Sequence, residues 1–258
     1  MRRETVVYGQ DHEFQVFDCL VPHRASGPTP VVVCIHGGGW HGGTRADTEP
    51  CGRLLVAAGF AAILADYRLT GKHPHPAQIE DMEAILAWIA REGAKRWLDR
   101  TRVAVTGASA GGHLSALLGL RATRRADAPC RVRCMIPVCG VHDISRWLAD
   151  RPDMLHCVEP MIGGPVQERA DVMREASPLF QVHRHAPPCL CPHGADDDLV
   201  PVSQSEALVD ALRKDGVAAE LAVVPCAGHT ADQPDTKPAE PLGGWPLFHE
   251  FLRKHMGM

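Results

Sequence analysis

One serine of the chain lies in a pattern that suits nucleophilic chemistry. Ser109 is the centre of Gly107-Ala108-Ser109-Ala110-Gly111, which follows an apolar run over 102–106 and precedes a helical run over 113–118. A G-x-S-x-G pattern between a strand and a helix is typical of a sharp turn that presents the serine hydroxyl above a sheet. The flanking glycines allow the strand and the helix to approach closely. The alternative is a plain turn of small residues, and the strand and helix on either side favour the nucleophile.

A serine hydroxyl is a weak nucleophile at neutral pH, so it needs a base beside it and hydrogen-bond donors that face the oxygen gaining charge. The run His36-Gly37-Gly38-Gly39-Trp40 follows a continuously apolar segment. The backbone N–H groups of Gly38 and Gly39 are candidate donors. Ala110 adds a third N–H at the first turn of the expected helix, where the helix dipole is positive. Trp40 is a candidate substrate contact, with plain core packing as the alternative.

The elements that must position these residues alternate between short apolar runs and helical segments. The runs over 31–35, 60–64 and 103–105 are continuously apolar, as strands buried on both faces are. Apolar residues at helical spacing cover 79–89, after Pro76. This alternation predicts an α/β fold with a mostly parallel sheet between two layers of helices, in which sites lie at the carboxyl ends of the strands.

Three other segments carry weaker local signals. Polar–apolar alternation over 13–17 predicts a half-exposed strand. Ser203, followed by a glutamate three residues later, predicts a capping box at the start of a helix. The stretch 140–188 has no clean period, and we expect either an irregular surface connection or a small cap inserted into a single domain that covers 1–258.

The composition excludes several classes of protein. The 258 residues are 45% hydrophobic and 22% charged, which is ordinary for a folded globular chain. A formal net charge of -4 argues against nucleic acid or an anionic membrane as a partner. No run approaches the roughly 18 apolar residues that a membrane span needs. The first 14 residues contain no apolar stretch, so we expect a cytoplasmic protein that is neither secreted nor membrane-anchored.

The cysteines and their neighbouring histidine could suggest a metal site. The ten cysteines include no C-x-x-C pair, and several lie within apolar runs, so we expect reduced, buried thiols. Cys189, Cys191 and His193 alternate along an expected strand and would share one of its faces. The one-residue spacers and the apolar Leu190 favour a buried strand over zinc. We therefore expect no metal.

With these residues placed, the chain resembles the α/β-hydrolase superfamily. Within it, the resemblance is to HGGGW-type esterases, which include acetyl xylan and feruloyl esterase-like and hormone-sensitive-lipase-like carboxylesterases. The matching segments run from about residue 31 to 229 and are His36 to Trp40, Asp66-Tyr67-Arg68-Leu69, Gly107 to His113, His193 to Pro201 and Ala227-Gly228-His229. The resemblance implies an α/β-hydrolase fold, a mostly parallel central sheet flanked by helices, with a small cap or none.

The resemblance also implies a catalytic triad in the order nucleophile, acid, histidine. Three adjacent carboxylates, Asp196, Asp197 and Asp198, follow the apolar run over 189–192, and their position alone does not choose among them. The family pattern H-G-x-x-D-x-x-V-P places the acid on Asp197. His229, in a loop after a β-rich run, is the candidate base, with an ordinary surface histidine as the alternative.

Together these residues predict a serine carboxylesterase that needs no cofactor. It would hydrolyse short-acyl esters, with acetyl or feruloyl esters of carbohydrates as candidates, through an acyl-enzyme on Ser109. Its partner is a small ester substrate, and the sequence indicates no oligomeric state. Two alternatives stay open: an arylformamidase or other amidase of the same fold, and a binding protein of this fold without catalysis. The complete set of Ser109, Asp197 and His229 argues against the second.

Overall fold

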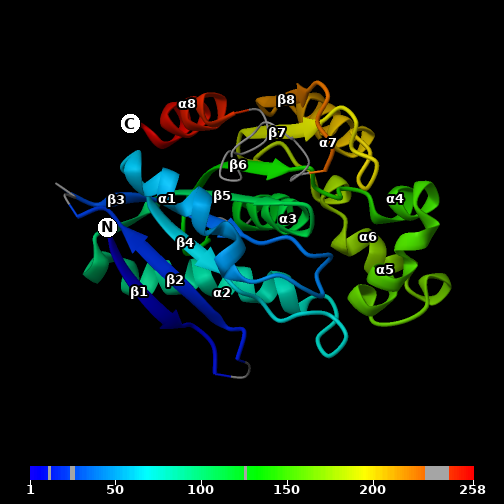
Figure 1. The fold of residues 1–258 in the computed structure, drawn as a ribbon, viewed down its shortest axis with the longest axis horizontal. Helices are drawn as coiled ribbons and strands as arrows, with labels where there is room; N and C mark the ends of the chain where they lie inside the picture. The colour runs from blue at the N-terminus through cyan, green and yellow to red at the C-terminus, as the bar shows by residue number, and fades with distance from the viewer. Residues whose placement is uncertain (11–12, 24–26, 125–126, 230–243) are drawn as a thin grey trace.

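The computed structural model describes residues 1–10, 13–23, 27–124, 127–229 and 244–258. A single eight-stranded sheet in the order β1-β2-β4-β3-β5-β6-β7-β8 forms its centre (Figure 1). The strands are β1 Arg2–Val7, β2 Val16–Val21, β3 Thr29–Ile35, β4 Ala61–Ala65, β5 Leu98–Ala108, β6 Val132–Val138, β7 Cys189–Gly194 and β8 Ala219–Val224. β2 pairs antiparallel with β1 and with β4, and all other pairs are parallel. The predicted mostly parallel sheet is therefore confirmed.

Helices cover both faces of this sheet (Figure 1). They are α1 Glu49–Ala57, α2 Ala77–Glu92, α3 Ala110–Arg124, α7 Ser203–Lys214 and α8 Trp245–Met256. Val31, Val33 and Ile35 of β3 belong to the core that contains α2, α3 and α7, whereas Val32 and Cys34 belong to the core that contains α1 and α8. Successive side chains of a strand point to opposite faces, so β3 fills both cores and its sequence is continuously apolar.

Short helices make up most of the stretch 140–188 between β6 and β7. They are α4 Ile144–Asp150, α5 Leu155–Ile162 and α6 Ala170–Ala176, with the 3-10 turns η3 Pro152–Met154, η4 Val166–Glu168 and η5 Pro178–Gln181. Helices of seven or eight residues complete about two turns, too few to give a clear 3.6-residue period in the sequence. In Figure 1 the three α-helices lie together beyond the carboxyl ends of the parallel strands.

The expected strand over 13–17 begins later than its alternation suggests. β2 starts at Val16, because the preceding chain turns: Tyr8 N–H donates to the Gln15 carbonyl over 2.9 Å. The Gln15 side chain is buried and its Nε2 donates to Asp81 Oδ1 over 2.8 Å. Burial of this polar side chain against another segment interrupts the pattern, so the alternation predicted the strand but not its first residue.

The predicted capping box at Ser203 is wrong. α7 begins at Ser203, and Val202 stands at the N-cap with helical angles, φ -53 and ψ -27, and no capping hydrogen bond from a side chain. The chain has therefore already entered the helix before the serine, which leaves Ser203 one position too late to cap it. The buried amide of Gln204 in this first turn instead accepts hydrogen bonds from the backbone N–H groups of His142 and Asp143, both over 2.8 Å.

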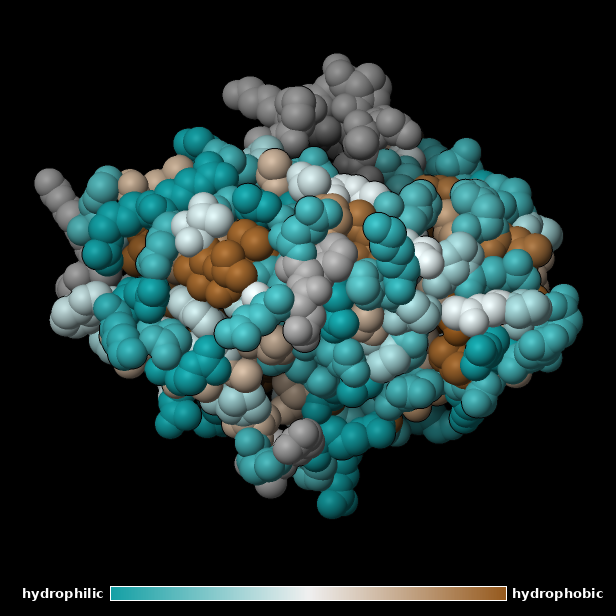
Figure 2. Space-filling view, turned by 90° about the horizontal axis from the view of Figure 1, so that it is seen from below, coloured by the Kyte–Doolittle hydropathy of each residue, from teal (hydrophilic) through white to brown (hydrophobic). Residues whose placement is uncertain are grey.

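The face of the molecule shown in Figure 2 is mainly hydrophilic. On the face shown in Figure 2, apolar side chains gather in small separate patches among polar ones. No helix in the described ranges is both long and apolar enough to cross a bilayer. All ten cysteines are free; Cys226 is exposed, Cys51 is half-buried and the other eight are buried, as their apolar neighbours in the sequence predict.

Candidate functional site

Ser109 lies in the tight turn that joins β5 to α3. Its φ is +58, in the left-handed region that non-glycine residues rarely occupy. A Cβ on Gly107 would lie 2.4 Å from the Ile35 carbonyl oxygen, and a Cβ on Gly111 only 2.1 Å from the same atom. Only glycine permits this approach of β3 to the turn. The Ser109 N–H donates to the Val138 carbonyl over 2.9 Å, which fixes the strained residue between two strands.

A cavity of about 170 Å³ lies beside Ser109. Gly39 and Ala110, two of the three predicted hydrogen-bond donors, line it together with the serine, whereas Gly38 is not among the lining residues. Gly39 has a φ of +57 and Gly38 a φ of +100, so the glycine run adopts the left-handed turns that its sequence suggests. The remaining lining residues are Trp40, His41, Val141, Trp147, Met154, Cys157, Leu199 and Val200.

Trp40 both packs in the core and lines this cavity. Its indole Nε1 donates to His113 Nδ1 over 3.0 Å, and His113 Nε2 in turn lies 2.7 Å from the Ala176 carbonyl oxygen. Because Nδ1 accepts, the proton must be on Nε2, which donates to that carbonyl. Burial lowers the pKa of His113 to about 4, so the ring is neutral at physiological pH. This relay connects the glycine loop through α3 to α6.

Asp197 and His229 form a hydrogen-bonded pair. The Nδ1 atom of His229 lies 2.7 Å from Asp197 Oδ2. The other carboxylate oxygen, Oδ1, accepts from the backbone N–H groups of Leu199 and Val200 over 3.0 and 2.8 Å. These contacts fix the orientation of the Asp197 carboxylate. Because this carboxylate accepts a hydrogen bond from His229, the proton of the neutral imidazole is held on Nδ1.

The environment of Asp197 differs from that of its two neighbours. Its side chain is buried, whereas Asp196 and Asp198 are exposed. Burial alone would raise the pKa of Asp197, but hydrogen bonds from His193, from His229 and from a backbone N–H outweigh it and hold that pKa well below its usual range. The carboxylate is therefore ionised at neutral pH. Of the three aspartates, the structure brings Asp197 to His229.

The second ring nitrogen of His229 is available as a proton acceptor. Nε2 is buried and has no hydrogen-bond partner among the described residues, so it is not bonded to the Ser109 hydroxyl in this structure. Contacts of this kind often tighten only when substrate is bound. Ser109 follows β5, Asp197 follows β7 and His229 follows β8, so the parallel strands deliver all three to one edge of the sheet. Leu199 and Val200, which bond Asp197, also line the cavity beside Ser109.

His36 and Tyr67 pack together at the start of the glycine loop. The rings of His36 and Tyr67 stack with centroids 4.2 Å apart, and the Tyr67 hydroxyl donates to the His36 carbonyl over 3.2 Å. Asp66 accepts from the Arg45 backbone N–H over 2.5 Å and also pairs with its guanidinium. Asp66 and Tyr67 therefore help to hold the glycine loop and the turn after it in place, and neither residue lines the cavity.

One group of possible metal ligands is present among the described residues. Ligand atoms of Cys139, His193 and Asp197 lie within 4.8 Å of one another. Both ring nitrogens of His193 already have hydrogen-bond partners. Its Nε2 lies 2.7 Å from the Val200 carbonyl, which can only accept, and its Nδ1 lies 2.7 Å from the Ser205 hydroxyl. A metal needs a nitrogen lone pair, and neither ring nitrogen offers one in this arrangement. The donor set fits a hydrogen-bond network better than a metal.

The alternating cysteines of β7 follow the expected geometry of a buried strand. The Sγ atoms of Cys189 and Cys191 lie 3.5 Å apart and both residues are buried. The next residue on that side of the strand, His193, turns its ring towards Ser205. This arrangement favours the structural interpretation of the Cys189, Cys191 and His193 series.

The sequence did not identify the residues that close the cavity. Val141, Trp147, Met154 and Cys157 come from the stretch 140–188 and line the cavity. Trp147 is fixed by a hydrogen bond from its Nε1 to the Leu199 carbonyl over 2.8 Å, and its ring meets that of Trp40 edge-on with centroids 5.9 Å apart. The only available signal was a tryptophan in a segment that follows the carboxyl end of a strand.

Several curated proteins similar in sequence to this chain carry esterase names. Esterase LipC of Mycobacterium tuberculosis (strain ATCC 25618 / H37Rv) is 34% identical over 226 residues, which cover 83% of this chain and 55% of LipC. Carboxylesterase NlhH of the same strain is 43% identical over 90 residues, which cover 34% of this chain and 28% of NlhH. The chain spans about half the length of the first curated relatives that it matches.

Solved structures establish the fold. A truncated carbohydrate esterase from gut microbiota superposes with a TM-score of 0.83 at 22% identity, covering 100% of this chain and 97% of that one. An esterase of Thermogutta terrifontis superposes with a TM-score of 0.80 at 23% identity, covering 98% and 92%. The predicted α/β-hydrolase fold is thereby confirmed. The BD-FAE family model matches residues 17–212, most of the sequence. The chain therefore belongs to the BD-FAE family.

Proposed function

We propose that this chain is a serine carboxylesterase that hydrolyses esters of short acyl groups through an acyl-enzyme. The observation that carries the proposal is the buried, ionised Asp197 bonded to His229 Nδ1, which leaves Nε2 as a base at the edge of the sheet where Ser109 is held in a strained turn. Esterase names among the curated relatives support the same activity.

In the first step, the Ser109 hydroxyl attacks the ester carbonyl while His229 Nε2 takes its proton. The ionised Asp197 stabilises the imidazolium that forms and keeps its ring in place. The carbonyl oxygen gains negative charge and is stabilised by the N–H groups of Gly39 and Ala110, with Gly38 as a third candidate; one such donor contributes about 3 kcal/mol in comparable sites. His229 then gives its proton to the leaving alcohol.

In the second step, water hydrolyses the acyl-enzyme. His229 Nε2 accepts a proton from the attacking water, and the same N–H groups stabilise the second tetrahedral intermediate. Collapse of that intermediate breaks the bond to the Ser109 oxygen, which regains the proton from His229. The carboxylic acid leaves and the enzyme returns to its starting state without a cofactor.

The size of the cavity supports a small acyl group. Its volume is about 170 Å³, and a closed apolar cavity of roughly 150 Å³ holds a benzene-sized molecule. Val141, Trp147 and Leu199 give it apolar walls. An acetyl group fits this space, whereas a feruloyl group, an aromatic ring with two substituents and a propenoyl linker, exceeds it. We therefore place acetyl esters before feruloyl esters as the substrate class.

Carbohydrate acetyl esters are the first natural substrates to test. One superposing structure is described as an acetyl ester-xyloside bifunctional hydrolase of Caldicellulosiruptor lactoaceticus, with a TM-score of 0.75 at 24% identity. Turnover of acetylated xylo-oligosaccharides should then exceed turnover of an aryl formamide. Faster turnover of the aryl formamide would favour the arylformamidase alternative. If the protein turned over neither of these substrates, nor a simple aryl acetate, a binding protein would be favoured.

The acyl preference should fall with chain length. On p-nitrophenyl esters we expect kcat/KM to be highest for acetate or propionate and at least about tenfold lower for octanoate, because each added methylene gains about 0.8 kcal/mol only where a cavity can bury it. Steady-state kinetics over the even-numbered acyl series measures this. A steady rise of kcat/KM from acetate to octanoate would contradict the assignment of the cavity to the acyl group.

Opening the cavity should relax that preference. Trp147→Leu and Trp147→Ala remove the ring that meets Trp40, so the octanoate-to-acetate ratio of kcat/KM should rise by about tenfold or more. Trp97→Ala removes an exposed indole elsewhere and should leave the ratio unchanged. An unchanged ratio in a folded Trp147→Leu variant would show that another wall limits chain length.

Removal of metal should have no effect on turnover. Both nitrogens of His193 are hydrogen-bonded, and the proposed chemistry proceeds through side chains alone. Dialysis against EDTA should therefore leave kcat/KM on p-nitrophenyl acetate unchanged. Adding zinc back to the dialysed protein should not raise its activity. Stoichiometric zinc in the purified protein, with loss of activity on its removal, would contradict the mechanism.

We also propose that the stretch 140–188 acts as a small cap within a single domain. Four of its residues line the cavity beside Ser109, and the Ala176 carbonyl of α6 accepts from His113. The ten free cysteines, eight of them buried, support a reducing compartment such as the cytoplasm.

A further inference from the structure

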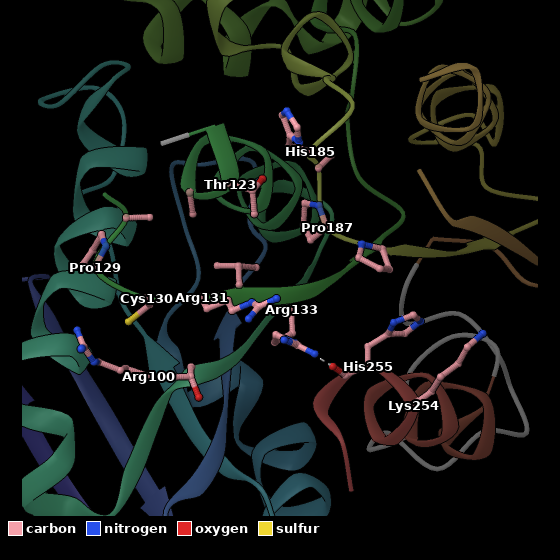
Figure 3. Close-up of a pocket in the computed structure, with 16 residues that line it drawn as sticks. Arg100, Thr123, Pro129, Cys130, Arg131, Arg133, His185, Pro187, Lys254 and His255 are labelled. Carbon is pink, nitrogen blue, oxygen red and sulfur yellow. Dashed lines mark hydrogen bonds between the residues drawn. The ribbon is translucent and has the colours of Figure 1, made fainter. Parts of the chain in front are cut away.

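A second cavity lies at the opposite end of β5 from Ser109. Its volume is about 710 Å³. Arg100 of β5, Arg131 just before β6, Arg133 of β6 and Lys254 of α8 line it; Figure 3 labels all four, with Arg100 and Lys254 on opposite sides of Arg131 and Arg133. β5 begins here at Leu98 and ends at Ala108, next to the nucleophile, so the full length of a strand separates the two cavities.

The charge of this cavity has one sign. No aspartate or glutamate is among its lining residues. In the part of the chain that the structure describes, none of the three arginines forms an ion pair; Arg133 Nε donates to the His255 carbonyl over 3.3 Å. Lys254 Nζ lies 4.0 Å from Glu220, which is outside the lining. Since the whole chain carries a net charge of -4, this concentration of cations does not follow from its composition.

His255 adds a polar group to the cavity without adding a fixed charge. His255 lines the cavity, and its pKa is lowered by burial and by the neighbouring Lys254 and Arg133. Three arginines and one lysine supply positive charge at neutral pH. Like charges that share a concave surface repel one another, and a cleft of one sign focuses its field on the solution inside it. A bound anion relieves this repulsion.

The shape and the donors of the cavity favour one class of anion. Guanidinium groups bind phosphate oxygens through paired hydrogen bonds, and several of them around one hollow suit a ligand with more than one negative charge. The volume lies within the roughly 300–1,000 Å³ of small-molecule sites. Pro129, Pro187 and Pro188 form part of the wall and limit its flexibility. We propose that this cavity binds a soluble small molecule that carries two or more phosphate charges.

Isothermal titration with inorganic pyrophosphate tests the proposal. We expect saturable 1:1 binding at low ionic strength that weakens by several-fold between about 20 and 200 mM NaCl, because Arg100 and Arg131 are solvent-exposed and salt screens their charges. The double variant Arg100→Gln/Arg131→Gln should bind at least about tenfold more weakly, since two of four cations are lost. Arg2→Gln, which removes an exposed arginine from the outermost strand, should bind like the parent.

Several outcomes would overturn the proposal. One is the absence of pyrophosphate binding to the parent protein, and another is equal affinity in the parent and the double variant. Thermal melts must show that the double variant is folded. We expect this because Arg100 and Arg131 are both exposed, so their replacement removes no buried contact. Co-sedimentation with phosphatidylglycerol vesicles, without binding of pyrophosphate, would assign the cations to a lipid surface and likewise overturn a soluble ligand. None of these readouts depends on ester turnover.

Discussion

Replacing Ser109 by alanine should abolish ester turnover and leave the fold intact. Loss of the attacking oxygen is expected to reduce kcat on p-nitrophenyl acetate by about 10⁴- to 10⁶-fold, with the remaining rate due to the hydrogen-bond donors and the cavity. The hydroxyl makes no packing contribution that alanine lacks, so the midpoint of thermal unfolding should move by no more than about 2 °C.

The control for this variant is a serine outside the site. Ser203→Ala changes the first residue of α7, whose side chain makes no capping hydrogen bond. It should keep the full rate of the parent. A Ser109→Ala protein that retains about a tenth or more of the parent kcat would show that another group attacks the ester.

Replacing Asp197 by asparagine should cost about 10⁴-fold in the chemical step. In a well-studied triad, the equivalent change leaves the geometry in place but favours the wrong imidazole tautomer. Asp196→Asn and Asp198→Asn are matched controls, because both side chains are exposed, and they should stay within a few-fold of the parent. Single-turnover kinetics with p-nitrophenyl acetate separates acylation from later steps. A larger loss in either control would place the acid one position away.

The same variant should alter the dependence of stability on pH. The pKa of Asp197 is lower in the folded protein than in the unfolded chain, so its ionised form stabilises the fold. This contribution is complete above the unfolded pKa of about 3.9 and is lost as the pH falls towards the lower folded value. The stability difference between parent and Asp197→Asn should therefore be constant near neutral pH and shrink below about pH 4.

The sequence predicted the parts of the site that depend on local geometry. Gly107, Ser109 and Gly111 could be identified because a strained turn under a close strand permits few residue types, and the structure has that turn. The choice of Asp197 came from a family pattern, since three adjacent aspartates in a loop look alike to local rules. Burial and hydrogen bonding distinguish it in the structure, and both depend on the tertiary fold.

Other features depend on contacts between distant segments and left no local signal. The relay from Trp40 through His113 to Ala176 joins three separate elements, and no periodicity marks its members. Trp147 lines the cavity from a helix of seven residues, too short for a clear pattern. The predicted capping box at Ser203 is wrong for a related reason. The backbone at Val202 is already helical, so the serine lies one residue past the N-cap position that a capping box requires.

Covalent labelling of the nucleophile tests the central claim most directly. The protein is incubated with an excess of a fluorophosphonate, and intact-mass and peptide mass spectrometry then count and locate the adduct. Activation of Ser109 by His229 and Asp197 predicts one adduct per chain, on Ser109, with none in Ser109→Ala and much slower labelling in Asp197→Asn. An adduct on any other residue of the parent, or stoichiometric labelling of Ser109→Ala, would contradict the account.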